Sequence, residues 1–137
     1  MLGIEYKAHL DLDITAMDHR LKIWGHWCRS GGLNPALWES DNEFGRKLTT
    51  YENNDSAKLQ LMVMRLPILH RMTIQVHYVD RGNNKETGER KKWREVNTRM
   101  RKAGEFKRIS ERDYPELLWR AWRIIVNSER FAKGETK

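Results

Sequence analysis

The sequence predicts an all-α protein, a helical bundle with a carboxyl-terminal helix-turn-helix. Apolar residues recur at three- and four-residue steps along most of the chain, which is the spacing of an amphipathic helix. Turn formers and capping residues separate these stretches. A length of 137 residues is enough for one domain with a real core, and the six Trp and six Met indicate a folded chain. We therefore expect a single domain over 1–137.

The first expected helix covers about 14–29. Asp11 or Asp13 is its expected cap, and the glycine-rich turn that begins at Gly31 ends it. Residues 30–55 are rich in turn formers and are expected to form a loop. The apolar face of this first helix consists of Ile14, Met17, Leu21, Trp24 and Cys28.

The second helix is expected after a cap within Asn53–Ser56, and Pro67 suits the first turn of a third helix. The β-branched run 73–79 is also compatible with a strand that turns at Gly82. A small β-hairpin or a long loop near 74–92 therefore stays open. The expected apolar faces of these two helices are Leu59, Met62, Val63 and Leu66, then Ile68, Leu69, Met72 and Val76.

The fourth expected helix covers about 92–103 and the fifth about 111–127, with a flexible tail over 128–137. Ser110 is placed to act as the N-cap of the fifth helix. If that helix begins at Asp113 instead, Asp113 and Glu116 form a capping box and the exposed face shifts. Its expected buried stripe consists of Leu117, Leu118, Ala121, Ile124 and Ile125.

Positive charge is concentrated in one segment of the chain. Residues 81–112 contain twelve Lys or Arg and five acids, a net charge of +7, which equals the formal net charge of the whole chain. Residues 1–60 contain seven bases and nine acids. Such a concentration is typical of a protein that neutralises phosphates, and a solvated basic helix face is the alternative.

In a helix-turn-helix the final helix enters the major groove, and the preceding helix and its flanks hold the DNA backbone. The expected base-reading residues are Glu111, Arg112 and Glu116, because arginine donates to guanine and a carboxylate accepts from cytosine. Ser110 lies at the amino end of this face and Arg120 further along it. The expected phosphate contacts are Arg94, Arg99, Arg101, Lys102, Lys107 and Arg108. We expect double-stranded DNA as a partner.

Several short motifs, in order, resemble the phage Q-type late transcription antitermination proteins. They are Trp24-Gly25-His26-Trp27, Leu66-Pro67, His77-Tyr78, and Ile109-Ser110 with Tyr114 and Ala121. The second half also resembles the helix-turn-helix of sigma-factor region four. The resemblance covers roughly 21–127 and is weak in 30–55.

Two segments depart from the pattern of that family. The turn Ala103–Ser110 has one extra residue and carries a charge in place of a glycine. The loop 80–92 is also longer than the family pattern. Some members carry a zinc-binding insert with several cysteines, and the single Cys28 argues against one here. The departures leave the base-reading residues open.

The resemblance implies a protein that binds DNA at a late promoter and loads onto a paused bacterial RNA polymerase holding sigma factor. It also implies that the modified polymerase reads through downstream terminators, since in the members without zinc the bound protein sits at the RNA exit channel and hinders hairpin formation there. It implies a DNA-binding unit over about 56–127 and a polymerase-facing part over about 1–55. Our hypothesis assigns Trp24, Trp27 and Trp38 partly to the core and partly to that contact.

Two other classes of protein stay open. A repressor or activator needs the same DNA module, although the sequence has no heptad seam that announces a dimer. A metal-dependent DNA junction nuclease is the weaker alternative. Its best acidic group, Asp11, Asp13 and Asp18 with His19, does not share one helix face, and His70 with His77 lacks the further ligands of a zinc site.

Other catalytic and membrane signals are missing from the sequence. It has no glycine-rich phosphate loop and no nucleophile elbow, and Cys28 lies among apolar positions that indicate an inert thiol. We expect no enzyme activity, cofactor, metal or small-molecule substrate. No apolar run reaches the length of a bilayer span, and the first residues do not resemble a signal peptide. The expected location is the bacterial host cytoplasm, at the nucleoid.

Overall fold

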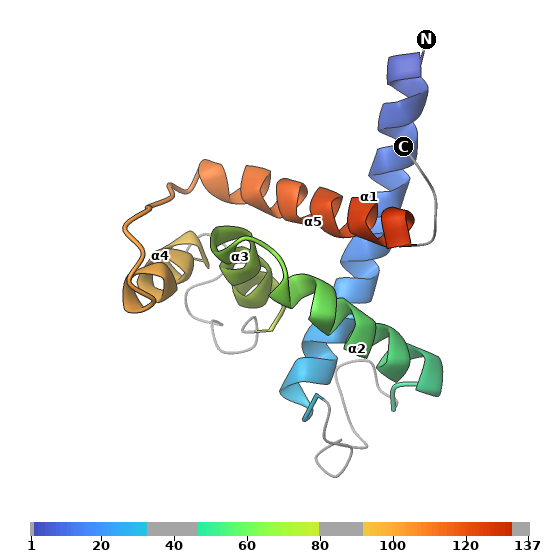
Figure 1. Ribbon diagram of the computed structural model, residues 1–137, viewed down its shortest axis with the longest axis horizontal. Coiled ribbons are helices and arrows are strands. Elements are labelled where there is room, and N and C mark those ends of the chain that lie inside the picture. The colour runs from blue at the N-terminus through green and yellow to red at the C-terminus, as the bar shows by residue number, and fades with distance from the viewer. Residues whose placement is uncertain (1, 33–46, 80–91, 133–137) are drawn as a thin grey trace.

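The computed structural model describes residues 2–32, 47–79 and 92–132, and every regular element in these ranges is a helix (Figure 1). The mainly helical class is therefore confirmed. The hairpin alternative is wrong for residues 74–79, and residues 80–91 lie outside the described ranges. The helices are α1 (Leu2–Arg29), α2 (Thr50–Met64), α3 (Ile68–Tyr78), α4 (Lys92–Lys102) and α5 (Asp113–Ala132).

Helix α3 is the centre of the arrangement, because it packs against α1, α2, α4 and α5. Helix α5 runs across the molecule and crosses α1, and α2 packs along the carboxyl-terminal half of α1 (Figure 1). The segment that joins α4 to α5 lies at the end of the molecule away from α1 (Figure 1). Residues 103–112 are thereby separated from α1.

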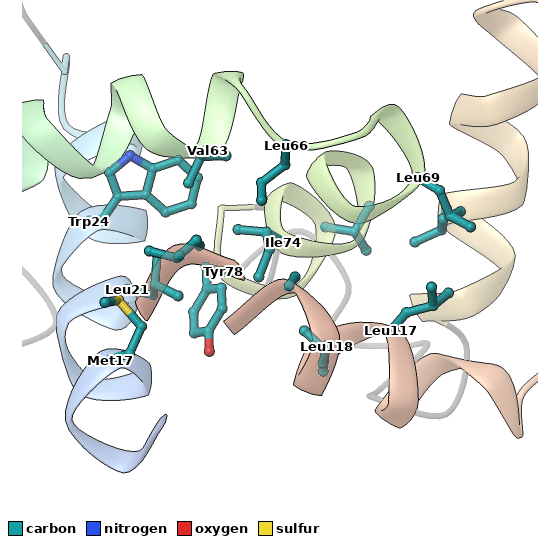
Figure 2. Close-up of a cluster of buried hydrophobic side chains, with 14 of the residues drawn as sticks. Met17, Leu21, Trp24, Val63, Leu66, Leu69, Ile74, Tyr78, Leu117 and Leu118 are labelled. Atoms are coloured by element: carbon teal, nitrogen blue, oxygen red, sulfur yellow. The ribbon is translucent and has the colours of Figure 1, made fainter. Parts of the chain in front are cut away.

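The core is one cluster to which all five helices contribute, and Figure 2 shows part of it around Tyr78. Trp24 and Tyr78 are its largest fully buried side chains. The predicted apolar faces are largely confirmed, with one exception on α5: Ile124 is 37% exposed. The central members are Met17, Leu21, Trp24, Leu59, Val63, Ile74, Val76, Tyr78, Val96, Met100, Ala121 and Ile125.

The β-branched run in α3 is helical because neighbouring helices surround it. Thr73, Ile74 and Val76 are fully buried, so their side chains gain contacts on several sides of α3. The hydroxyl of Thr73 donates to the carbonyl of Leu69 at 2.8 Å, which satisfies it inside the helix. This burial outweighs the modest preference of branched residues for strands.

Two helices begin earlier than predicted. Helix α1 passes through Asp11 and Asp13, and Asp13 pairs with Arg130 of α5 instead of capping a helix. Helix α2 begins after Thr49, not within Asn53–Ser56. Thr49 and Glu52 form a capping box, in which the Glu52 N–H donates to the Thr49 hydroxyl at 3.1 Å and the Thr49 N–H to the Glu52 carboxylate at 2.8 Å.

Helix α5 extends to Ala132, so the flexible tail predicted from residue 128 is wrong for 128–132. Two ion pairs tie this last part to α1. Glu129 accepts from Arg20 at 2.6 Å, and Asp13 pairs with Arg130. Arg20 also holds Asp55 of α2 at 2.7 Å, and its acidic partners raise its already high pKa. Arg20 thus joins three helices.

Candidate nucleic-acid interface

The most exposed stretch of the described chain is residues 101–108, which we call the basic tip. Each of its eight residues is exposed. It carries four bases and one acid, Glu105. None of these four bases forms an ion pair with another described residue. The four are Arg101, Lys102, Lys107 and Arg108.

Defined hydrogen bonds fix both ends of the basic tip. At its start α4 ends at Lys102, and the chain turns at Gly104, which has a φ of 81° that favours glycine. The Glu105 N–H donates to the Met100 carbonyl at 2.9 Å. At its end the Asn97 amide donates to the Ile109 carbonyl at 2.8 Å, and the Ile109 N–H donates to the Asn97 side-chain oxygen at 2.9 Å. Ile109 itself is buried. The exposed segment therefore leaves and rejoins the body at fixed points.

The start of α5 is capped by Ser110, as predicted. The Asp113 N–H donates to the Ser110 hydroxyl at 3.3 Å, and the Ser110 N–H donates to the Asp113 carboxylate at 2.9 Å. The capping pair is thus Ser110 with Asp113, and the predicted pair of Asp113 with Glu116 is wrong. Hydrogen bonds from the Ser110 backbone and hydroxyl lower the pKa of Asp113, so its carboxylate is charged at neutral pH.

The helical part of α5 begins at Asp113, so Glu111 and Arg112 lie on the segment before it. Both are exposed, and so is Glu116 in the first turn. Ten residues, 103–112, connect α4 to α5, whereas a helix-turn-helix uses about three or four. Both helices pack against α3. The described helices therefore do not reproduce the short turn of the predicted motif.

One side of α5 forms an exposed stripe of residues three or four apart, and it includes Trp119, which sequence reasoning did not select. Trp119 is 37% exposed, and the guanidinium of Arg123 lies over its ring at 5.4 Å. Arg120 pairs with Glu116 at 2.6 Å. Trp119 was detectable because it falls off the apolar stripe of the helix. The exposed stripe consists of Glu116, Trp119, Arg120, Arg123 and Asn127.

The bases of α4 differ in how accessible they are. Arg94 is exposed and lies over the ring of Trp93 at 5.2 Å. Arg99 is half-buried and 3.9 Å from Glu95, and burial lowers its pKa from a very high ordinary value. Lys92 is buried, and its ammonium donates to the His77 carbonyl at 3.4 Å. Of the predicted phosphate contacts on α4, Arg94, Arg101 and Lys102 are therefore better placed than Arg99.

A small cavity of about 180 Å³ lies between the start of α3, the basic tip and the first turns of α5. Lys107, Arg108 and Arg120 contribute to its walls. Next to this region, burial and then the positive charges of Arg120 and Lys107 lower the pKa of His70. Lys107 and Arg108 of the basic tip and Arg120 of α5 therefore lie on one shared surface.

Four of the motif residues that carried the family resemblance, Gly25, His77, Tyr78 and Tyr114, meet in one place, which we call the Tyr78 cluster. The Tyr78 hydroxyl donates to Asp18 of α1 at 2.5 Å and accepts from the Trp122 indole of α5 at 2.7 Å. His77 and Tyr114 share a hydrogen bond of 2.9 Å. Burial, and then the hydrogen bond to Asp18, raise the pKa of Tyr78. The cluster consists of Asp18, Gly25, His77, Tyr78, Tyr114 and Trp122.

Gly25 belongs to this cluster because it allows α1 to touch the end of α3. A β-carbon at this position would lie 2.4 Å from the Tyr78 carbonyl oxygen, closer than atoms can pack. Beside it, the Arg29 guanidinium donates to the carbonyls of Tyr78 at 2.5 Å and Val79 at 3.1 Å. The glycine of the Trp-Gly-x-Trp motif therefore has a packing role.

The tryptophans of that motif are core residues, so a direct polymerase contact by Trp24 or Trp27 is wrong for this structure. Trp24 is 1% exposed and Trp27 is 3% exposed. The Trp24 indole donates to Gln60 of α2 at 3.0 Å. Trp38 lies outside the described residues.

The residues considered for metal binding or nucleophilic chemistry have other roles. Asp13 and Asp18 take part in the contacts with Arg130 and Tyr78 described above, and the side chain of Asp11 is outside the description. In the described ranges, no group of three or more His, Cys, Asp or Glu side chains is placed to hold a metal ion. Burial raises the pKa of Cys28 to about 12, so its thiol stays protonated.

Comparisons with known proteins identify no relative, since no family model, no curated protein and no solved structure matches the chain. Within residues 2–32, 47–79 and 92–132, no helix has both the length and the apolar character needed to cross a bilayer.

Proposed function

We propose that this protein binds double-stranded DNA through the basic tip and the exposed stripe of α5. The observation that carries the proposal is the contrast among the cations. Arg20 and Arg130 form ion pairs with other helices, whereas the four bases of the tip have no such partner among the described residues. Exposed, unneutralised cations on one surface attract phosphates and release condensed counterions on binding.

The rigid attachment of the tip supports a specific geometry of binding. Asn97 and the Ser110 cap hold the segment at its carboxyl-terminal side, so its bases are placed relative to the start of α5. A helix start with Ser110, Arg112 and Glu116 around it combines backbone-binding and base-reading groups. Sequence reading in this proposal comes from the exposed stripe, including Arg123 and Trp119, and phosphate binding from the tip.

The finer part of the proposal rests on the resemblance to phage Q-type antiterminators. In that role the DNA-bound protein loads onto bacterial RNA polymerase in the host cytoplasm and suppresses termination downstream. It is supported by the position of Gly25, His77, Tyr78 and Tyr114 from those motifs, which lie in the Tyr78 cluster and join α1, α3 and α5.

The experiment is selection of duplex DNA from a random library, followed by titration of the enriched sequence with and without purified bacterial RNA polymerase. An enriched motif that binds more tightly when polymerase is present supports antitermination. A palindromic motif indifferent to polymerase supports a repressor or activator instead. The absence of enrichment, with only salt-sensitive binding, contradicts sequence-specific recognition.

A charge variant tests the DNA surface itself. Arg101→Ala with Lys102→Ala should weaken binding to all duplexes alike and reduce the slope of log affinity against log salt by about 2. Lys58→Ala is the control, because Lys58 is an exposed base on α2, away from the tip. An unchanged affinity and salt slope in the double variant would contradict the proposal.

A further inference from the structure

Phe106 is the most exposed large apolar side chain in the described part of the protein. It is 93% exposed, more than Phe131 at 78% or Tyr51 at 75%. It lies in the basic tip, where Glu105 directly precedes it, Arg101 and Lys102 lie further back, and Lys107 and Arg108 follow it. A phenylalanine ring left in water forgoes the free energy of burial, so an exposed position at the tip is unfavourable unless the ring contacts a partner.

The anchors of the tip keep this ring away from the core. Gly104, two residues before Phe106, turns the chain out of α4, and Ile109, three residues after it, is buried and held by Asn97. Nothing lies within 4 Å of the β-carbon position at Gly104, so the surroundings of the turn are open. Phe106 is therefore presented at the edge of the molecule together with the cations.

The charge of the surroundings selects the partner. An aromatic ring with Lys and Arg residues on both sides matches a nucleic-acid strand, in which each nucleobase has a phosphate on either side. The same ring would gain little from an intact duplex, because paired bases are already stacked. An unpaired base exposes a face on which a phenyl ring can stack, whatever the base.

We propose that Phe106 stacks on an unpaired nucleobase of DNA, while the Lys and Arg side chains of the tip bind the phosphates on either side of that nucleobase. The protein then prefers DNA in which a duplex adjoins an opened stretch over an intact duplex. This inference rests on the proposed DNA-binding function and adds the class of DNA that the tip recognises. Arg101 and Lys102 serve one flank in this arrangement, and Lys107 and Arg108 serve the other.

The test compares three fluorescent probes by anisotropy: an intact duplex, the same duplex with a short central run of mismatches, and its single strand. The wild-type protein should bind the mismatched duplex more tightly than the intact one. Phe106→Ala should lose about 5- to 100-fold in affinity for the mismatched duplex and the single strand, and almost nothing for the intact duplex. Phe106→Trp should retain the preference.

Phe131→Ala is the matched control, since it removes another largely exposed phenyl ring, at the far end of α5. Both side chains are exposed, so thermal unfolding should be unchanged in both variants. The absence of a preference for the mismatched duplex in the wild type, or equal losses on all probes in Phe106→Ala, would overturn the stacking role. The intact-duplex arm reports separately on the proposed function, because it depends on the cations and not on Phe106.

Discussion

The polar side chains of the Tyr78 cluster have hydrogen-bond partners from other helices, whereas the charged side chains of the basic tip are exposed. In the cluster the Tyr78 hydroxyl donates to Asp18 and accepts from Trp122, and these two partners come from two other helices. In the tip the four cations have no ion-pair partner among the described residues. Satisfied buried groups hold the helices together, and unsatisfied exposed charges are available for a partner. The comparison indicates that stability and binding are assigned to different regions.

The largest effect is expected from Gly25→Ala. The added methyl group would lie 2.4 Å from the Tyr78 carbonyl oxygen, so α1 and α3 must separate. We expect a loss of about 3 kcal/mol in the free energy of unfolding, measured by urea denaturation. His19→Ala, at an exposed position of the same helix, should change it by less than about 0.5 kcal/mol. A variant as stable as the wild type would refute the close contact.

The next effect is expected from Tyr78→Phe. The change removes one hydroxyl, so the Trp122 indole loses its acceptor and Asp18 keeps only its ion pair with Lys22 at 3.3 Å. Unfolding should therefore become easier by about 2 kcal/mol. Tyr51→Phe is the control, because Tyr51 is 75% exposed. DNA affinity should stay the same where the protein remains folded. A loss of DNA affinity without a loss of stability would contradict the assignment of stability and DNA binding to two different regions.

Asn97→Ala tests the link between the regions. It removes both hydrogen bonds to Ile109, and we expect a loss of about 1–2 kcal/mol in the free energy of unfolding. The position of the tip is then less defined, so affinity for duplex DNA should decrease without a change of charge. The salt slope should stay unchanged, which distinguishes this variant from the removal of Arg101 and Lys102. Unaltered DNA affinity would show that the anchor is dispensable for binding.

The smallest effect concerns the titration of His70. Burial, and then the charges of Arg120 and Lys107, lower its pKa in the folded protein below the ordinary 6.5. Between the pKa of the folded protein and the ordinary 6.5, the unfolded chain therefore binds more protons than the folded protein. The free energy of unfolding should therefore decrease as the pH falls from about 6.5, and His70→Gln should reduce this dependence. Denaturation curves at a series of pH values measure it.

Bound DNA should act on the same histidine in the opposite direction. Phosphates near Arg120 and Lys107 offset their charge, so the pKa of His70 should increase when duplex DNA is added, as followed by its NMR signal. Lysine and arginine residues elsewhere do not enter this effect. A His70 titration that is identical with and without bound DNA would place the DNA on another surface.

Local patterns were enough for the helical class, most of the apolar faces and the Ser110 cap. Each of these depends on residues within one or two turns of each other, because the helix period and the capping hydrogen bond are short-range. The capping box of Thr49 and Glu52 was also readable, and it was passed over for the polar run Asn53–Ser56. The charge of the 81–112 segment was visible from composition alone.

Contacts between distant segments decided the rest. The run that contains Thr73 and Ile74 became helical because four helices surround α3, and Gly25 gained its role from a residue more than fifty positions away. Asn97 gave no signal, because its partner is the backbone of Ile109 across a turn. Sequence by itself determined which residues are apolar, capping or charged. Only the tertiary structure decided which charges are neutralised, because that depends on whether an opposite charge from another helix lies within reach.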